Sequence, residues 1–133
     1  MPPRSARRFW LLALLGLTTV AATAVPADAP FSFRRLRTLQ AENALILVAA
    51  TAPGLPACSQ QRDILRDFQI DHPETGLKIL WVDYEQQKRE LKYLNISLPG
   101  TLILYRGTER RWASVSEMNA DVIGTAILRV ARE

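Results

Sequence analysis

Two short apolar runs constrain the fold of this chain more than any other feature. They are Ala44–Ala50 (ALILVAA) and Lys78–Asp83 (KILWVD). Continuous apolar runs of this length predict strands that are buried on both faces of a sheet. Between them, Ala57–Ile70 has a helical pattern, in which Cys58, Ile64, Leu65, Phe68 and, less tightly, Gln61 share one face. Buried strands separated by a helix are typical of an α/β domain with right-handed crossovers.

The rest of the chain continues this alternation. We expect helices over Phe33–Ala41, Glu85–Leu94 and Glu117–Arg132, and strands over Thr101–Tyr105 and Arg110–Val115. Gly107 lies between the last two strands, where it turns the chain so that the second pairs back as an antiparallel edge. The sequence therefore predicts one α/β domain with a central mixed sheet of about four strands flanked by helices.

The first 29 residues have the pattern of a secretory leader. Arg4, Arg7 and Arg8 give a positive start, and Phe9–Val25 follows with 17 residues that carry no charge. Ala27-Asp28-Ala29 then supplies the small residues that a signal peptidase recognises. We expect residues 1–29 to be a cleaved signal peptide and residues 30–133 to be the folded domain, periplasmic or secreted. An uncleaved leader that anchors the chain in the inner membrane is the alternative.

Charge and composition exclude several classes of function. Without residues 1–29 the chain has 104 residues, of which 14 are basic and 12 are acidic, so its net charge is +2. This small excess is weak support for nucleic-acid binding, and no nucleic-acid partner is predicted. The whole chain has one cysteine, which excludes an internal disulfide, a Cys-x-x-Cys pair and a Cys-rich zinc site. It has one histidine, which excludes a metal site built from several histidines. No metal or cofactor is predicted.

Three strings, in this order, resemble the thioredoxin family across residues 31–133. The first is the apolar run at Leu45–Ala50, followed by a loop and by Pro56-Ala57-Cys58 at a helix start. The second is Trp81-Val82-Asp83-Tyr84, and the third is Leu98–Gly107, similar to the family's Pro-Thr-Leu-x-x-Phe-x-x-Gly hairpin. With the leader, the chain most resembles bacterial periplasmic thioredoxin-like proteins. The resemblance implies the thioredoxin-like fold.

The chain departs from the family at the residues that carry its chemistry. If Cys58 takes the place of the second cysteine of Cys-x-x-Cys, Leu55 takes the place of the first, which is the attacking nucleophile. Gly54 replaces the preceding tryptophan, and Ala49 replaces a buried carboxylate. Gly100 stands where the family has a cis-proline, with Pro99 one residue earlier. Four changes at one site suggest that dithiol chemistry has been lost.

These departures predict a binding module that performs no dithiol exchange. In the family, the two loops of the site grip extended peptides. The corresponding residues here are Gly54, Leu55, Pro56, Ala57, Pro99, Gly100 and Thr101. The expected partner is a protein or an extended peptide in the periplasm, bound without bond exchange. A membrane would be a partner only if the leader is retained.

Two alternatives remain open on the sequence. Cys58 could act as a monothiol that forms a mixed disulfide, or it could be a small apolar residue in the first turn of a helix. The chain could also be a membrane-tethered subunit of an assembly. Arg34, Arg35 and Arg37 form the densest basic cluster, for which a solvated face is expected and anionic lipid headgroups or an acidic partner are alternatives.

Overall fold

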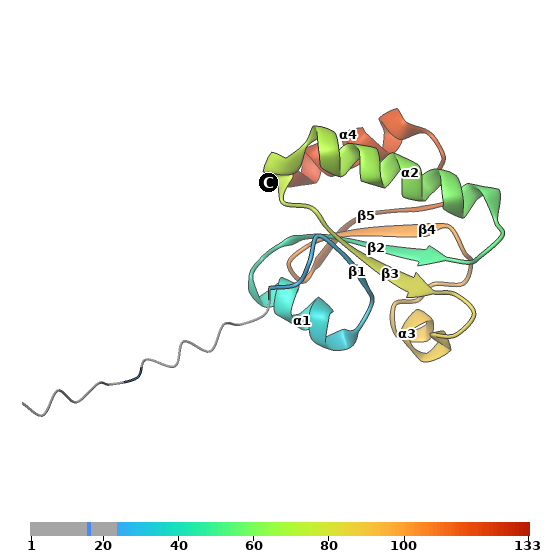
Figure 1. The fold of residues 1–133 in the computed structure, drawn as a ribbon, viewed down its shortest axis with the longest axis horizontal. Helices are drawn as coiled ribbons and strands as arrows, with labels where there is room; N and C mark the ends of the chain where they lie inside the picture. The colour runs from blue at the N-terminus through green and yellow to red at the C-terminus, as the bar shows by residue number, and fades with distance from the viewer. Residues whose placement is uncertain (1–15, 17–23) are drawn as a thin grey trace, which may run out of the picture.

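The computed structural model describes Gly16 and residues 24–133, which form five strands, four α-helices and one 3₁₀ turn (Figure 1). In chain order the elements are β1 (Asp28–Pro30), α1 (Phe33–Ala41), β2 (Leu45–Thr51), α2 (Pro56–Asp71), η1 (Pro73–Thr75), β3 (Lys78–Asp83), α3 (Lys88–Tyr93), β4 (Thr101–Arg106), β5 (Glu109–Val115) and α4 (Ala120–Ala131). Among these residues, no helix is both long enough and apolar enough to cross a membrane.

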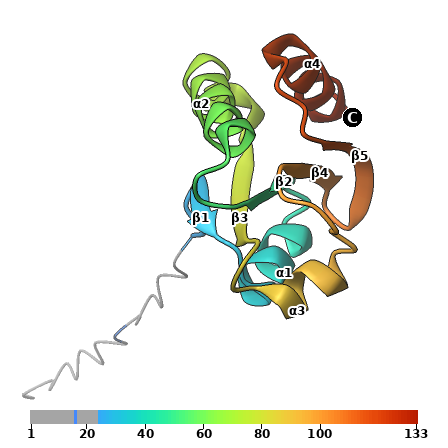
Figure 2. The same cartoon turned by 90° about the vertical axis from the view of Figure 1, so that its right-hand side faces the viewer.

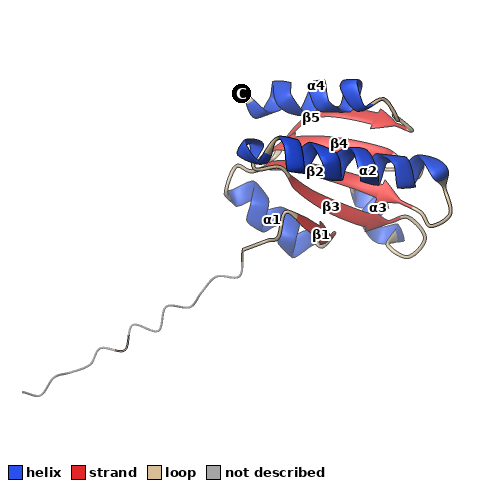
Figure 3. Ribbon diagram, turned by 45° about the horizontal axis from the view of Figure 1, so that its top comes forward, coloured by secondary structure: helices blue, strands red, loops and turns tan. Residues whose placement is uncertain are grey.

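The five strands form one mixed sheet in the order β1-β3-β2-β4-β5 (Figure 3). Strand β3 pairs in parallel with both β1 and β2. Strand β4 runs antiparallel to β2, and β5 pairs antiparallel to β4 at the edge, as predicted for the hairpin around Gly107. Gly107 has a φ of +57°, which an L side chain rarely adopts. The predicted fold class is confirmed, with one strand more than the pattern indicated.

Helices cover both faces of the sheet, with α2 and α4 on one face and α1 and α3 on the other (Figure 2). Successive residues of a strand point to opposite faces, so β2 contributes to two apolar cores. Leu45 and Leu47 pack with the cluster under α2 and α4, whereas Ile46 and Val48 pack with the cluster under α1 and α3. This two-sided burial explains why β2 is continuously apolar in the sequence.

Two helices begin later than their sequence patterns predict. The predicted helix at Glu85 begins at Lys88, because the Asp83 carboxylate accepts hydrogen bonds from the backbone of Glu85 and Gln86 and holds a turn there. The predicted helix at Glu117 begins at Ala120, because the Asn119 side chain caps it. In both cases a polar side chain accepts hydrogen bonds from backbone N–H groups, just before α3 and in the first turn of α4, and apolar periodicity does not reveal such contacts.

Strand β1 is the one strand of the described sheet that the sequence pattern did not predict. Asp28 and Ala29, both assigned to the leader, pair with Ile79 and Leu80 of β3, and Ala29 is buried. The backbone oxygen of Ala27 accepts a 2.8 Å hydrogen bond from the backbone N–H of Ile79. The predicted boundary at residue 30 thus falls inside a strand. Cleavage of the leader stays a prediction, and most of its apolar run lies outside the described residues.

Removing strand β1 is expected to weaken the domain. We compare a chain that starts at Pro30 with one that starts at Val25 and keeps the strand. Loss of the β1 hydrogen bonds and of the buried Ala29 should lower the free energy of unfolding by about 2 kcal/mol. Thermal unfolding should then show a melting temperature about 10 °C lower for the shorter chain. Equal melting temperatures would show that β1 contributes nothing to stability.

Candidate functional site

The candidate site lies at the end of the sheet where β2 passes into α2 (Figure 1). Gly54, in the connecting turn, has a φ of +80°, in the left-handed region that glycine tolerates. Leu55 is the N-cap of α2 in an extended conformation, and Pro56 follows in the first helical turn, where a missing backbone N–H costs nothing. Gly54 and Pro56 therefore determine where the helix starts and place Cys58 in its first turn.

The thiol of Cys58 is inside the protein, whereas the nucleophile position is at the surface. Cys58 is 4% exposed and Leu55 is 40% exposed. The backbone N–H of Cys58 donates to the backbone oxygen of Leu55 at 3.1 Å, so the two residues form one turn. A thiolate must reach a target disulfide to attack it. The only thiol of the chain is buried here, and the residue that could reach a target is an aliphatic leucine.

The loop before β4, Leu98–Thr101, is held by backbone hydrogen bonds to two neighbouring segments. The Gly100 N–H donates to the Ala50 oxygen at 2.8 Å, and the Gly100 oxygen accepts from the Ser116 N–H at 3.0 Å. Gly100 has a φ of +80°, and no cis peptide bond is present among the described residues, so Pro99 is trans. The loop therefore differs from the family's pattern both in residue type and in backbone conformation.

The predicted binding residues separate into exposed and buried groups. Gly54, Leu55 and Pro56 are exposed, Ala57 and Pro99 are half-buried, and Gly100 and Thr101 are buried. The N–H of Gly100 is already bonded, and Pro99 has no N–H to offer. A partner would thus contact mainly the side chains of the first group, and this loop offers few main-chain donors for pairing with an extended peptide.

Gln61 is a structural residue of the site whose role the sequence did not reveal. Its side chain is 2% exposed, and its Nε2 donates to the Gly100 oxygen at 2.9 Å and to the Glu117 oxygen at 3.0 Å. One amide group therefore ties α2 to the Leu98–Thr101 loop and to the segment after β5. The available signal was a polar residue on the inward face of α2, one helical turn after Cys58.

Apolar side chains are exposed at the same end of the sheet. They are 40–54% exposed and come from the start of α2, from the loop before β4 and from the segment that ends β5: Leu55, Leu98, Val115 and Met118. The hydrogen bond from Ser116 to Gly100 joins the last two of these segments. We call these four residues the apolar rim. They are exposed large apolar side chains on the segments that carry or adjoin the two loops of the candidate site.

The position of the family's buried carboxylate is fully apolar here. Ala49 is buried in β2, opposite Leu102 of β4 and Trp81 of β3. The guanidinium carbon of Arg62 lies over the Trp81 ring, 4.1 Å from the ring centroid. This geometry is a cation–π contact, which stabilises the packing of α2 on the sheet. No acid or base lies at position 49 to move a proton to or from Cys58.

His72 lies at the far end of α2 from Cys58. It is the C-cap of the helix, its ring lies 4.8 Å from that of Phe68, and its Nδ1 is 3.2 Å from Oε1 of Glu74. A backbone hydrogen bond, with a further contribution from His72, holds the pKa of the exposed Glu74 carboxyl below its usual value. The histidine therefore has a local structural role at the helix end.

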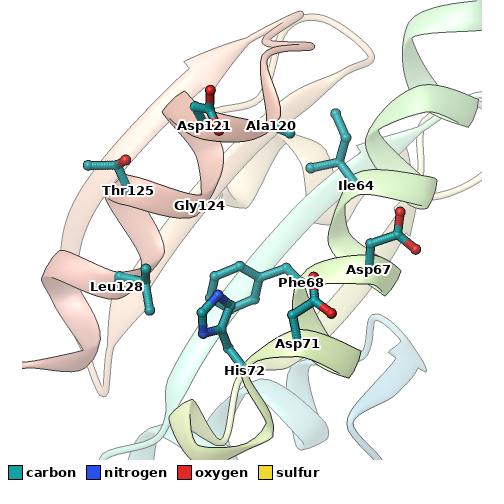
Figure 4. A pocket seen from close by; sticks show the side chains of 10 residues that line it. All are labelled: Ile64, Asp67, Phe68, Asp71, His72, Ala120, Asp121, Gly124, Thr125 and Leu128. Atoms are coloured by element: carbon teal, nitrogen blue, oxygen red, sulfur yellow. The ribbon is translucent and has the colours of Figure 1, made fainter.

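A groove of about 320 Å³ runs between α2 and α4 (Figure 4). Ile64, Phe68 and Leu128 give it an apolar floor, and the carboxylates of Asp67, Asp71 and Asp121 lie along its sides. In the part of the chain that the structure describes, no group of three acidic, histidine or cysteine side chains is close enough to hold a metal ion. Among the described residues, the groove thus contains no thiol and no metal-binding cluster.

Solved structures with the same architecture are thioredoxins and thioredoxin-like proteins. Trxlp from Edwardsiella tarda has a TM-score of 0.71 and 26% identity, over 75% of this chain and 97% of that protein. Thioredoxin from Trypanosoma brucei brucei has a TM-score of 0.66 and 16% identity, over 85% and 97% of the two chains. Thioredoxin from Fasciola hepatica has a TM-score of 0.66 and 17% identity, over 77% of this chain and 97% of that protein. No protein-family model and no curated protein matches the sequence.

Proposed function

Given that this chain is a thioredoxin-like protein, we propose that it binds a protein or an extended peptide without exchanging disulfides. The observation that carries the proposal is the inverted exposure of the motif: Leu55 is exposed at the nucleophile position, and the only thiol is buried. Dithiol exchange needs an accessible attacking sulfur and a second one that resolves the mixed disulfide. The chain supplies one thiol, that of Cys58, which is 4% exposed.

The apolar rim is the proposed contact surface. A partner that covers Leu55, Leu98, Val115 and Met118 would remove four exposed apolar side chains from water, which is the main favourable term in most protein association. The hydrogen bonds around Gly100 and Gln61 hold the segments that carry these residues, so little ordering would be needed on binding. The partner therefore needs apolar side chains and needs no disulfide.

Capture of a partner under reducing conditions tests the proposal. The immobilised full chain is incubated with periplasmic extract, and the retained proteins are identified by mass spectrometry. We expect wild type and Cys58→Ala to retain the same partner, and the double variant Leu55→Asp/Leu98→Asp to lose it by at least about tenfold. Ile70→Asp is the matched control, because Ile70 is an equally apolar, 69% exposed residue near the opposite end of α2.

The alternative monothiol function makes the opposite prediction. If Cys58 forms a mixed disulfide, capture by wild type should be released by reductant and should be absent in Cys58→Ala. Cys58 should then also react with iodoacetamide in the native protein as fast as in urea. Either result would overturn the proposed binding without bond exchange.

We also propose that the chain is exported, on the basis of the positive start and the uncharged Phe9–Val25 segment. Contacts of the folded domain extend back to Val25, whose backbone oxygen accepts a 3.1 Å hydrogen bond from Nζ of Lys78. Fractionation and N-terminal sequencing of the native product test export. A protein that stays in the cytoplasm with residues 1–29 intact would contradict it, and an intact leader in the membrane fraction would support the tethered form.

A further inference from the structure

The face of the domain formed by α1 and α3 concentrates positive charge. The two helices together carry six basic residues and one acidic residue: Arg34, Arg35, Arg37, Lys88, Arg89, Lys92 and Glu90. Even with the flanking Glu42 and Glu85, an excess of three positive charges remains. The helices on the opposite face, α2 and α4, carry three basic and four acidic residues. The small net charge of the domain therefore conceals a strongly uneven distribution.

Most of these cations have no carboxylate partner in the part of the chain that is described. The ion pairs found there involve Arg66, His72 and Arg111, all outside this face. Within the face, Arg35 donates to the Pro30 oxygen, and Nζ of Lys88 lies 4.3 Å from the centroid of the Tyr84 ring. These contacts leave the positive charges uncompensated, so the face attracts anions.

Two of the arginines line one pocket together with aromatic side chains. The pocket, of about 370 Å³, is lined by Phe33, Leu36, Arg37, Gln40, Arg89 and Tyr93. The rings of Phe33 and Tyr93 pack edge to face with centroids 5.0 Å apart, and Tyr93 is 71% exposed. Guanidinium groups beside an apolar floor suit a phosphate group attached to an apolar body, because arginine binds phosphate through a planar pair of N–H donors.

From this combination we infer that the α1–α3 face docks on an anionic phospholipid surface, with a headgroup phosphate between Arg37 and Arg89. Basic residues near an anionic membrane each add to the attraction, and exposed aromatic rings favour the headgroup layer. A single small anion would use the pocket but not Arg34 or Lys92, which also lie exposed on these helices. A lipid surface uses all of them at once.

The path of the chain agrees with this orientation. Val25, the last residue of the uncharged leader segment, packs against the apolar cluster under α1 and α3. Ala24, Val25 and Pro26 line a second surface pocket with Arg34 and Arg35. A leader inserted in a bilayer would therefore bring the same face toward the headgroups. The docking itself is a property of the folded domain and does not depend on the protein-binding function proposed above.

Lysine footprinting of the full chain tests the inference, because the chain has only three lysines. Lys88 and Lys92 lie on α3, and neutral vesicles provide the reference, because Nζ of Lys78 donates to the Val25 oxygen next to the leader. The chain is mixed with vesicles of phosphatidylcholine, with or without 30% phosphatidylglycerol, and acetylated. We expect acetylation of Lys88 and Lys92 to be at least about fivefold slower with the anionic vesicles than with the neutral ones. The protection should disappear in 0.5 M salt.

Charge-reversal variants distinguish this face from a general effect of charge. Arg37→Glu/Arg89→Glu should lose the protection, whereas Arg110→Glu/Arg132→Glu, with the same change in net charge but on β5 and after α4, should keep it. Protection that is equal with neutral vesicles, or that survives Arg37→Glu/Arg89→Glu, would overturn the inference. So would protection by soluble polyglutamate but not by anionic vesicles, which would indicate an acidic protein as the partner.

Discussion

Replacing Leu55 with cysteine is expected to give the chain a disulfide and a measurable oxidoreductase activity. The variant has the sequence Cys-Pro-Ala-Cys at the start of α2, with the new thiol at a 40% exposed position. Residues 55 and 58 form a hydrogen-bonded turn, and the ends of such a turn lie within 7 Å, the range that a disulfide can bridge. The new thiol sits at the N-terminus of a 16-residue helix, whose dipole stabilises a thiolate.

The measurements are the intact mass and the rate of insulin reduction. Oxidised Leu55→Cys should be about 2 Da lighter than its reduced form, and its rate should exceed that of wild type by at least about 100-fold, because wild type lacks the nucleophile. Leu55→Ser, similar in size to cysteine, is the control and should stay inactive. Leu55→Cys/Cys58→Ser should accumulate mixed disulfides. A Leu55→Cys protein that neither forms the disulfide nor reduces insulin would show that the missing thiol is not the only reason for the loss of dithiol activity.

Replacing Gln61 with leucine is expected to lower stability and to loosen the site. The substitution keeps most of the side-chain volume but removes the donor that serves the Gly100 and Glu117 oxygens. The Glu117 oxygen then loses this partner, and the Gly100 oxygen keeps only Ser116. Loss of a buried donor costs about 2 kcal/mol in the free energy of unfolding. Urea unfolding measures this loss, and hydrogen exchange at Gly100 and Ser116 should quicken in parallel.

Gln60→Leu is the matched control for Gln61→Leu. Gln60 is the preceding residue of α2 and is exposed, so its replacement should leave stability within about 0.5 kcal/mol of wild type. Gln61→Leu could instead match this control in both the free energy of unfolding and the exchange rates. The hydrogen bonds from Gln61 to Gly100 and Glu117 would then contribute nothing measurable to stability.

Elements with strong apolar patterns could be predicted from the sequence, and elements defined by polar contacts could not. The bounds of α1 and β3 agree with prediction to the residue, because their apolar spacing is unbroken. Strand β1 has three residues and no alternating pattern, and its existence depends on hydrogen bonds to β3, about 50 residues away.

The sequence order of the candidate site's two loops indicated which residues would lie together, but it did not indicate which of them would be accessible. The motif order placed Leu55 and Cys58 together, and the structure does so. That Gly100 and Thr101 are buried, and that Gln61 holds their loop, depends on contacts across 39 to 56 residues, which a linear pattern does not contain. The sequence likewise does not show that Arg37 and Arg89 line one pocket, because the two residues lie on separate helices.

The two edges of the sheet limit how this domain can associate with other chains. An exposed edge strand invites pairing with another strand, either in a partner or in aggregates. Edge strand β1 is only three residues long and ends in Pro30, which has no N–H to donate. Edge strand β5 begins with Glu109, Arg110 and Arg111, and its ladder with β4 is irregular at Leu104 and Tyr105. Strand addition is therefore disfavoured at both edges, so the domain should stay free of fibrous self-assembly at high concentration, and its partners should recognise side chains.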